Sequence, residues 1–156
     1  DFAVQVAKCI GKMGREVTLS ITGGPSLENV IYENLEVKKF GWVTMEERKA
    51  LLAESDFLLS PSKFEGSSMA IIESMVSGLP CLASEASRET IGIDDLIIRD
   101  LSPDKWAERI LQLCEKETYR KVVDSVLINA EKYGSEANRI KIGEIYEGLL
   151  GSNDSD

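Results

Sequence analysis

The chain of 156 residues is 43% hydrophobic and has a formal net charge of −9, which suits one globular domain with a full core. The acidic balance argues against a nucleic-acid partner and against electrostatic binding to anionic lipid, because both require a basic face. No histidine occurs, so histidine-dependent nucleophilic catalysis and histidine metal sites are excluded.

Apolar periodicity and turn residues predict strands that alternate with helices. The expected strands are residues 16–22, 35–42, 56–60, 80–83 and 96–99. The expected helices are residues 1–13, 44–55 and 67–77, followed by two or three helices within 103–150. This order predicts an α/β fold, a Rossmann-like parallel sheet with helices on both faces and further C-terminal helices. One domain would span residues 1–150, and the polar tail 151–156 is expected to be disordered.

The cysteines indicate the location of the protein, and the tryptophans indicate candidate core positions. The three cysteines, Cys9, Cys81 and Cys114, are far apart and form no C-x-x-C pair. Such a set is typical of reduced thiols, so we expect a cytoplasmic protein. Trp106 is predicted to lie in the core, whereas Trp42 suits either the core or a stacking contact with a base.

The segment 61–77 carries the strongest site signal that spacing provides. In open parallel α/β sheets, ligands bind beyond the carboxyl ends of the strands, and the loop 61–66 follows the predicted strand 56–60. Gly66 allows a ligand to approach the backbone, and Ser67 or Ser68 is a natural N-cap. Because the first N–H groups of a helix are unpaired, this helix start is a candidate anion site.

The helix that follows places one carboxylate among small residues. At ~100° per residue, Met69, Ile72 and Val76 share a face that we expect to pack on the sheet, with Ile71 and Met75 adjoining it. Glu73 shares another face with small or polar residues, which are Ala70, Ser74 and Ser77. A ligand would therefore lie against the face that carries Glu73.

Glu65 and Glu73 stand on either side of the predicted phosphate site. A nucleotide sugar has hydroxyl groups on both sides of its diphosphate, so Glu73 would accept from the ribose and Glu65 from the sugar. Two other interpretations remain open on spacing alone. Both glutamates can be solvated surface charges, or they can form a carboxylate pair of the glycosidase type.

Several segments together resemble one family. The stretch EGSSMAIIESMVSGLPCLAS, with Pro61 and Ser62 before it, follows the pattern P-S-x-x-E-G of retaining nucleotide-sugar glycosyltransferases with the GT-B fold, glycosyltransferase family 4. The residues in register are Pro61, Ser62, Glu65, Gly66, Glu73, Met75, Gly78, Pro80, Ala83 and Ser84. LSITGGP and FGWV upstream, and SPDKWAERILQL downstream, also resemble segments of that family.

The resemblance implies a C-terminal, donor-binding domain and a role for each matching residue. Glu65 would be the catalytic residue that contacts the transferred sugar, and Glu73 would bind the ribose. The residues implied at the diphosphate and cleft are Gly66, Ser67, Ser68, Met69, Gly23 and Gly24, with Val43 near the base. The donor would be a UDP-, GDP- or ADP-linked sugar, bound without a metal or cofactor, and the acceptor a glycan or glycolipid of polysaccharide biosynthesis.

The chain also departs from the family pattern. Ser68 replaces the second glycine of E-G-x-G, and residues 85–90 (EASRET) replace a glycine-rich loop. The resemblance further implies that the domain's first strand and the N-terminal acceptor domain lie outside this chain, so the chain alone would be inactive. Any membrane association would come from that missing half.

Two hypotheses of other classes remain open. In the first, the chain is a non-catalytic nucleotide-sugar binding module or one subunit of a two-chain transferase. In the second, it is a flavodoxin-like signalling domain in which the spacing of the two glutamates is accidental.

Overall fold

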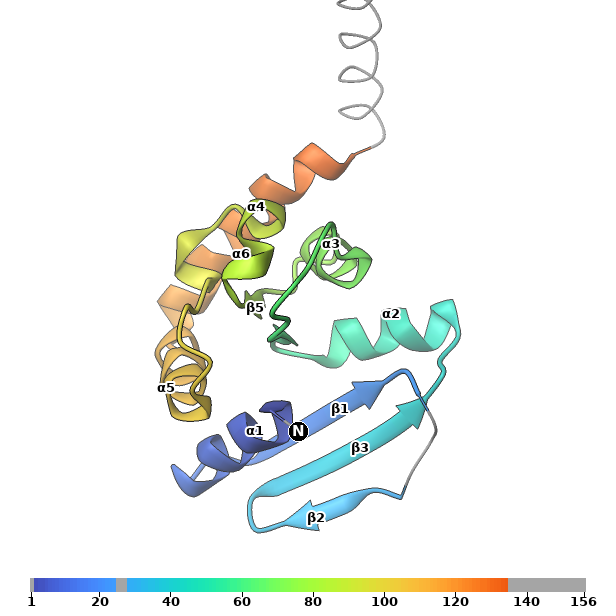
Figure 1. The fold of residues 1–156 in the computed structure, drawn as a ribbon, viewed down its shortest axis with the longest axis vertical. Helices are drawn as coiled ribbons and strands as arrows, with labels where there is room; N and C mark the ends of the chain where they lie inside the picture. Colours follow the sequence, from blue (N-terminus) through green and yellow to red (C-terminus); the bar gives the residue numbers. More distant parts are fainter. Residues whose placement is uncertain (1, 25–27, 135–156) are drawn as a thin grey trace, which may run out of the picture.

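The structure is a computed structural model that describes residues 2–24 and 28–134 (Figure 1). The strands are β1 (Val17–Thr22), β2 (Val30–Tyr32), β3 (Leu35–Gly41), β4 (Leu58–Ser60) and β5 (Cys81–Ala83). The α-helices are α1 (Phe2–Lys12), α2 (Met45–Glu54), α3 (Met69–Val76), α4 (Arg88–Ile91), α5 (Pro103–Leu113) and α6 (Lys116–Ala130). Short 3₁₀ turns are η1 (Glu85–Ser87), η2 (Asp94–Leu96) and η3 (Glu131–Tyr133).

Parallel strand pairs with covering helices confirm the predicted Rossmann-like α/β fold. β1 pairs with β3 in parallel, and β4 pairs with β5 in parallel. β2, which the sequence did not predict, adds to β3 in the antiparallel sense. Asn34 turns the chain between β2 and β3 with a φ of 58°, a conformation that asparagine tolerates better than most residues.

The described strands form two sheets rather than one. Their orders are β1-β3-β2 and β4-β5, so within the described ranges β1 and β4 each have one edge without a strand partner. Figure 1 shows β5 and its sheet on the side of β1 that is opposite to β3. The prediction of a strand at 96–99 is wrong. The turn η2 ends at Leu96, and beyond it a single parallel bridge joins Ile97 to Ala83.

Local signals set the helix starts well. Thr44 caps α2 through the predicted capping box, in which Thr44 N donates to Glu47 Oε2 at 2.7 Å and Thr44 Oγ1 accepts from Glu47 N at 3.2 Å. Ser102 is the N-cap of α5 with Pro103 in its first turn, although the Ser102 side chain makes no capping bond. The helices predicted beyond residue 134 and the tail 151–156 lie outside the described residues.

The main core lies among α1, α3, α5, α6 and the β4-β5 sheet. The largest fully buried side chains include Trp106, Ile71, Met75, Leu82 and Leu96. Trp106 meets Phe2 edge to face at 5.2 Å between ring centroids, and its Nε1 donates to Asp100 O at 3.0 Å. Trp42, in contrast, is 87% exposed, so it is not a core residue.

Helix α2 contributes no fully buried residue to this core. It crosses from β3 in one sheet to β4 in the other (Figure 1). Its most enclosed apolar residues, Leu51 and Leu52, are only half-buried. The helix therefore lacks the covered face that normally stabilises a helix of a globular protein.

The fold predicts an order of thiol reactivity. Burial raises the pKa of Cys81 to about 12, so we expect no reaction with Ellman's reagent at pH 8 until the protein unfolds. Cys9 donates to Asp104 Oδ1 at 3.0 Å, a bond that raises the Cys9 pKa and slows its reaction. Cys114 is exposed and should react first, although partial desolvation raises its pKa too. Peptide mapping of the modified protein gives the order, and rapid labelling of Cys81 under native conditions would contradict the fold.

Candidate functional site

Three of the predicted site segments follow the carboxyl ends of parallel strands. Gly23 and Gly24 follow β1, Val43 lies after β3, and the loop 61–68 follows β4. Gly23 N donates to Gly41 O at 2.6 Å, so the turn after β1 is attached to the end of β3, two residues before Val43. The structure therefore places the first two of these segments side by side, and their part in a donor cleft stays a prediction.

The glycines of these segments border open space. Gly23 and Gly24 have φ values of 84° and 86°, which side chains rarely permit. A Cβ added at Gly23, Gly24 or Gly66 would meet no atom within 4 Å. A ligand can thus reach the backbone at all three positions.

Helix α3 begins with unpaired donors. Ser68 is its N-cap, and the helix starts at Met69, two residues later than the start predicted at residue 67. The Ser68 side chain makes no capping hydrogen bond, and its carbonyl accepts from Ile72 N at 3.1 Å. The first amides of α3 therefore have no intrahelical acceptor, and they stand at the positive end of the helix dipole.

The predicted faces of α3 are partly wrong. Met69 and Val76, expected to pack on the sheet, are 63% and 58% exposed. The buried residues of the helix are Ile71, Met75 and Ser74, and Ser74 was expected on the ligand face. Ser74 tolerates burial because its Oγ donates to Leu79 O at 2.7 Å, which satisfies the hydroxyl in place of water. Ser74 is thus excluded from contact with a ligand.

Glu73 forms an ion pair with a residue of the neighbouring helix α2. Its Oε2 lies 3.2 Å from Arg48 Nε on α2, and its side chain is 30% exposed. The rest of its predicted face, Ala70 and Ser77, is exposed. Arg48 was not identified from the sequence, since 25 positions separate the two residues and no local pattern joins them.

Glu65 borders a hollow of about 610 Å³ on another side of the start of α3. This volume lies in the ordinary range of small-ligand sites. The residues around the hollow are Glu65, Gly66, Ser67, Glu85, Ala86, Arg88, Glu89, Thr90 and Tyr133. Tyr133 OH donates to Thr90 O at 2.6 Å, and Thr90 Oγ1 donates to Gly66 O at 3.5 Å. These bonds hold the loop before α3 against α4 and η3.

The hollow is negatively charged. Three carboxylates, of Glu65, Glu85 and Glu89, border it together with one cation, Arg88. Arg88 donates to Glu85 Oε1 at 2.6 Å and also to Asp94, and its hydrogen bond holds the pKa of Glu85 below the usual range. Arg88 is therefore already neutralised, and the hollow suits a neutral group with hydroxyl donors better than an anion.

Sequence patterns did not predict this wall of the hollow. Residues 85–90 stood out only as a departure from the family pattern, and the structure folds them into η1 and the start of α4. Tyr133 reaches the hollow from 43 positions beyond Thr90. No spacing rule connects positions so far apart.

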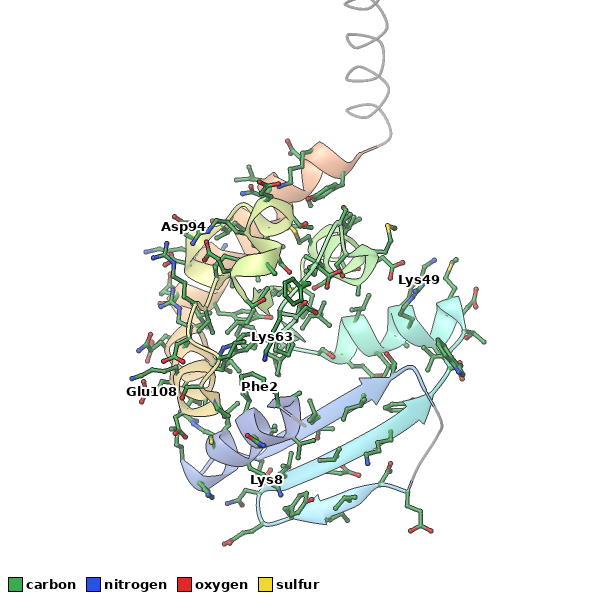
Figure 2. All side chains as sticks on the ribbon, in the orientation of Figure 1. Phe2, Lys8, Lys49, Lys63, Asp94 and Glu108 are labelled. Atoms are coloured by element: carbon green, nitrogen blue, oxygen red, sulfur yellow. The ribbon has the colours of Figure 1, made fainter. Side chains whose placement is uncertain are left out.

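A second hollow, of about 580 Å³, lies on the α4–α5 side of the molecule. Two of the residues around it, Asp94 and Glu108, are labelled in Figure 2, far from Lys49 on α2. Its cations have carboxylate partners, as in the pairs Arg109–Asp95 and Lys105–Glu108. None of the predicted site residues borders it.

Comparison with known proteins identifies the family. The family model described as glycosyl transferases group 1 matches residues 1–116. The chain belongs to this family. A protein of Klebsiella pneumoniae named "Uncharacterized 41.2 kDa protein in cps region" is 28% identical over 91 residues, which make up 58% of this chain and 24% of that protein. The chain thus spans about a quarter of the length of that relative.

Family membership confirms the resemblance and supports glycosyl transfer as the general function. Within residues 2–24 and 28–134, none of the helices combines the length and the apolar character of a membrane span. The same residues contain no group of three or more His, Cys, Asp or Glu side chains that could hold a metal ion. Independence from metals remains a prediction.

Proposed function

We propose that this glycosyltransferase chain is the donor-binding part of a retaining enzyme that moves a sugar from a nucleoside diphosphate to a glycan or glycolipid. One observation carries the proposal in a chain of this family. An uncapped helix start in open space has a carboxylate on each side, with Glu65 at the hollow and Glu73 beside α2.

Each part of the donor finds a suitable group. The diphosphate binds at the amides of Gly66, Ser67, Ser68 and Met69, where the helix dipole favours an anion. Glu65 accepts from the hydroxyls of the transferred sugar inside the acidic hollow. Glu73 accepts from the ribose. The Gly23–Gly24 turn and Val43 border the cleft on the side of the base.

The unpaired strand edges support a further part of the proposal. Within the described ranges, β1 and β4 each lack a partner on one edge, and α2 has no buried residue. We propose that the first strand of the domain and the acceptor domain are supplied from outside this chain. A second candidate function, one subunit of a two-chain transferase, draws on the same edges, because a separate chain could supply that strand.

Two further observations concern the pathway and the location of the proposed enzyme. The name of the Klebsiella relative refers to a cps region, which supports a polysaccharide acceptor. The dispersed, unpaired cysteines support a cytoplasmic enzyme. The reaction is proposed to need no metal ion for the donor.

Calorimetric titration of the longest natural polypeptide that contains these residues tests the donor site. We expect saturable binding of one of UDP, GDP and ADP, with inorganic phosphate as the control that binds far more weakly. Added EDTA should leave the affinity unchanged. Amide shifts of the complex should fall on residues 65–73 and 41–43. Binding of none of the three nucleotides would overturn the proposed function.

A further inference from the structure

Arg48 is the cation that the structure places against Glu73. Its Nε lies 3.2 Å from Glu73 Oε2, with the Arg48 side chain 45% exposed and that of Glu73 30% exposed. We infer that Arg48 is a positioning residue, which holds Glu73 in the orientation that accepts the ribose hydroxyls of the donor. This inference rests on the function proposed above.

The ion pair between Arg48 and Glu73 is not an important source of stability. Pairs this exposed contribute little to the free energy of unfolding, because water and salt screen them. Helix α2 has no buried residue, so the pair does not secure a packed interface either. Its effect is on the conformation of one side chain, since a glutamate on a helix surface otherwise samples many rotamers.

The ion pair uses only part of the hydrogen-bonding capacity of the Glu73 carboxylate. The ion pair joins Arg48 Nε to Glu73 Oε2 at 3.2 Å, and the carboxylate has a second oxygen that can accept from other donors. A carboxylate has about four lone-pair sites, and one contact from Nε leaves enough of them for a hydroxyl pair. Ordering the side chain before the donor arrives reduces the entropy lost on binding.

Arg48 also connects two parts of the proposed site. Arg48 lies in the first turn of α2, where its N donates to Thr44 O at 3.0 Å. Thr44 is the N-cap that directly follows Val43, the residue proposed beside the base. The ion pair therefore joins Glu73, the proposed acceptor for the ribose, to the helix that begins directly after the segment proposed near the base.

The test compares ribonucleotides with 2′-deoxyribonucleotides in wild type, Arg48→Ala and the control Lys49→Ala. Lys49 is the next residue of α2 and is exposed (Figure 2). We expect Arg48→Ala to weaken binding of the ribonucleoside diphosphate by about three- to tenfold, the size expected for losing one ordered side chain. Binding of the deoxy compound, which keeps only one of the two hydroxyls, should weaken less than that of the ribonucleotide, and Lys49→Ala should change neither. Arg48→Lys, which keeps the charge without the planar fork, should show a smaller loss of the same kind.

A purely structural or electrostatic role would give a different pattern. Arg48→Ala would then weaken both nucleotides equally, or neither, and either result overturns the inference. In a double-mutant cycle, Arg48→Ala should add almost nothing to Glu73→Gln, and additive losses would also overturn it. If wild type binds no nucleoside diphosphate, the proposed function fails first, so the two failures are distinguishable.

Discussion

Replacing Glu73 and Glu65 by glutamine should damage two different steps. We expect Glu73→Gln to weaken binding of the nucleoside diphosphate by about 10- to 100-fold, because hydrogen bonds to a charged acceptor contribute about 1.5–3 kcal/mol. Glu65→Gln should leave that affinity within about twofold, since its side chain borders the hollow proposed for the sugar. The same change should lower the rate of transfer by about 10²–10³-fold, the size seen when one group that stabilises developing charge is removed.

The separation of effects follows from the neighbours of each carboxylate. Glu65 has Gly66 and Ser67 beside it and the η1–α4 segment opposite, whereas Glu73 has Arg48 of α2. The measurements are calorimetry with the nucleoside diphosphate and turnover of the nucleotide sugar, both with the full natural polypeptide. Glu89→Gln is the matched control, because Glu89 is an exposed carboxylate at the same hollow that has no proposed role.

Two outcomes would contradict this division. Loss of nucleotide affinity in Glu65→Gln would place the sugar elsewhere, and unchanged affinity in Glu73→Gln would remove the ribose contact. An equal loss in Glu89→Gln would show that the charge of the hollow matters rather than any one residue.

Local signals predicted most of the elements of this fold. The capping box at Thr44–Glu47 depends on residues three positions apart, so the sequence alone determines it. The strands β1 and β3 were predicted to within one residue at each end from their composition and the glycines that end them. The hairpin strand β2 was missed, although the equally short β4 and β5 were predicted from the apolar runs that contain them.

Faces and partners were harder to predict because they depend on tertiary packing. The ~100° rule placed Met69 inside and Ser74 outside α3, but it cannot tell which stripe meets the rest of the protein. Here α3 packs against α6 as well as the β4-β5 sheet, and Ser74 is fully buried. The loop glycines and both glutamates followed from the motif, whereas Arg48, Thr90 and Tyr133 enter through contacts between distant positions.

Extending the chain by the first strand proposed above should stabilise the protein strongly. We expect this strand to lie between β1 and β4, which would join the orders β1-β3-β2 and β4-β5 into one sheet. Strand, helix and parallel strand connect with right-handed crossovers, and α1 is already placed as the helix between the added strand and β1. Figure 1 shows the start of α1 beside β1.

The expected gain is large because the added strand would be covered on both faces. Each large apolar side chain that it buries contributes about 1.5–3 kcal/mol, so two or three of them should raise the free energy of unfolding by about 3–9 kcal/mol. The strand would also cover Leu51 and Leu52 of α2, which are only half-buried now. Urea unfolding of the 156-residue chain and of the extended chain measures the difference.

Hydrogen exchange identifies where the gain arises. Amides of β1 and β4 that have no acceptor in β3 or β5 should become protected in the extended chain, and those of β2 should not change. A matched extension with proline at the centre of the new strand should lose most of the gain, because proline cannot donate to either neighbour. Equal stability of the short and extended chains, with the same exchange at β1 and β4, would contradict the prediction of a strand between β1 and β4.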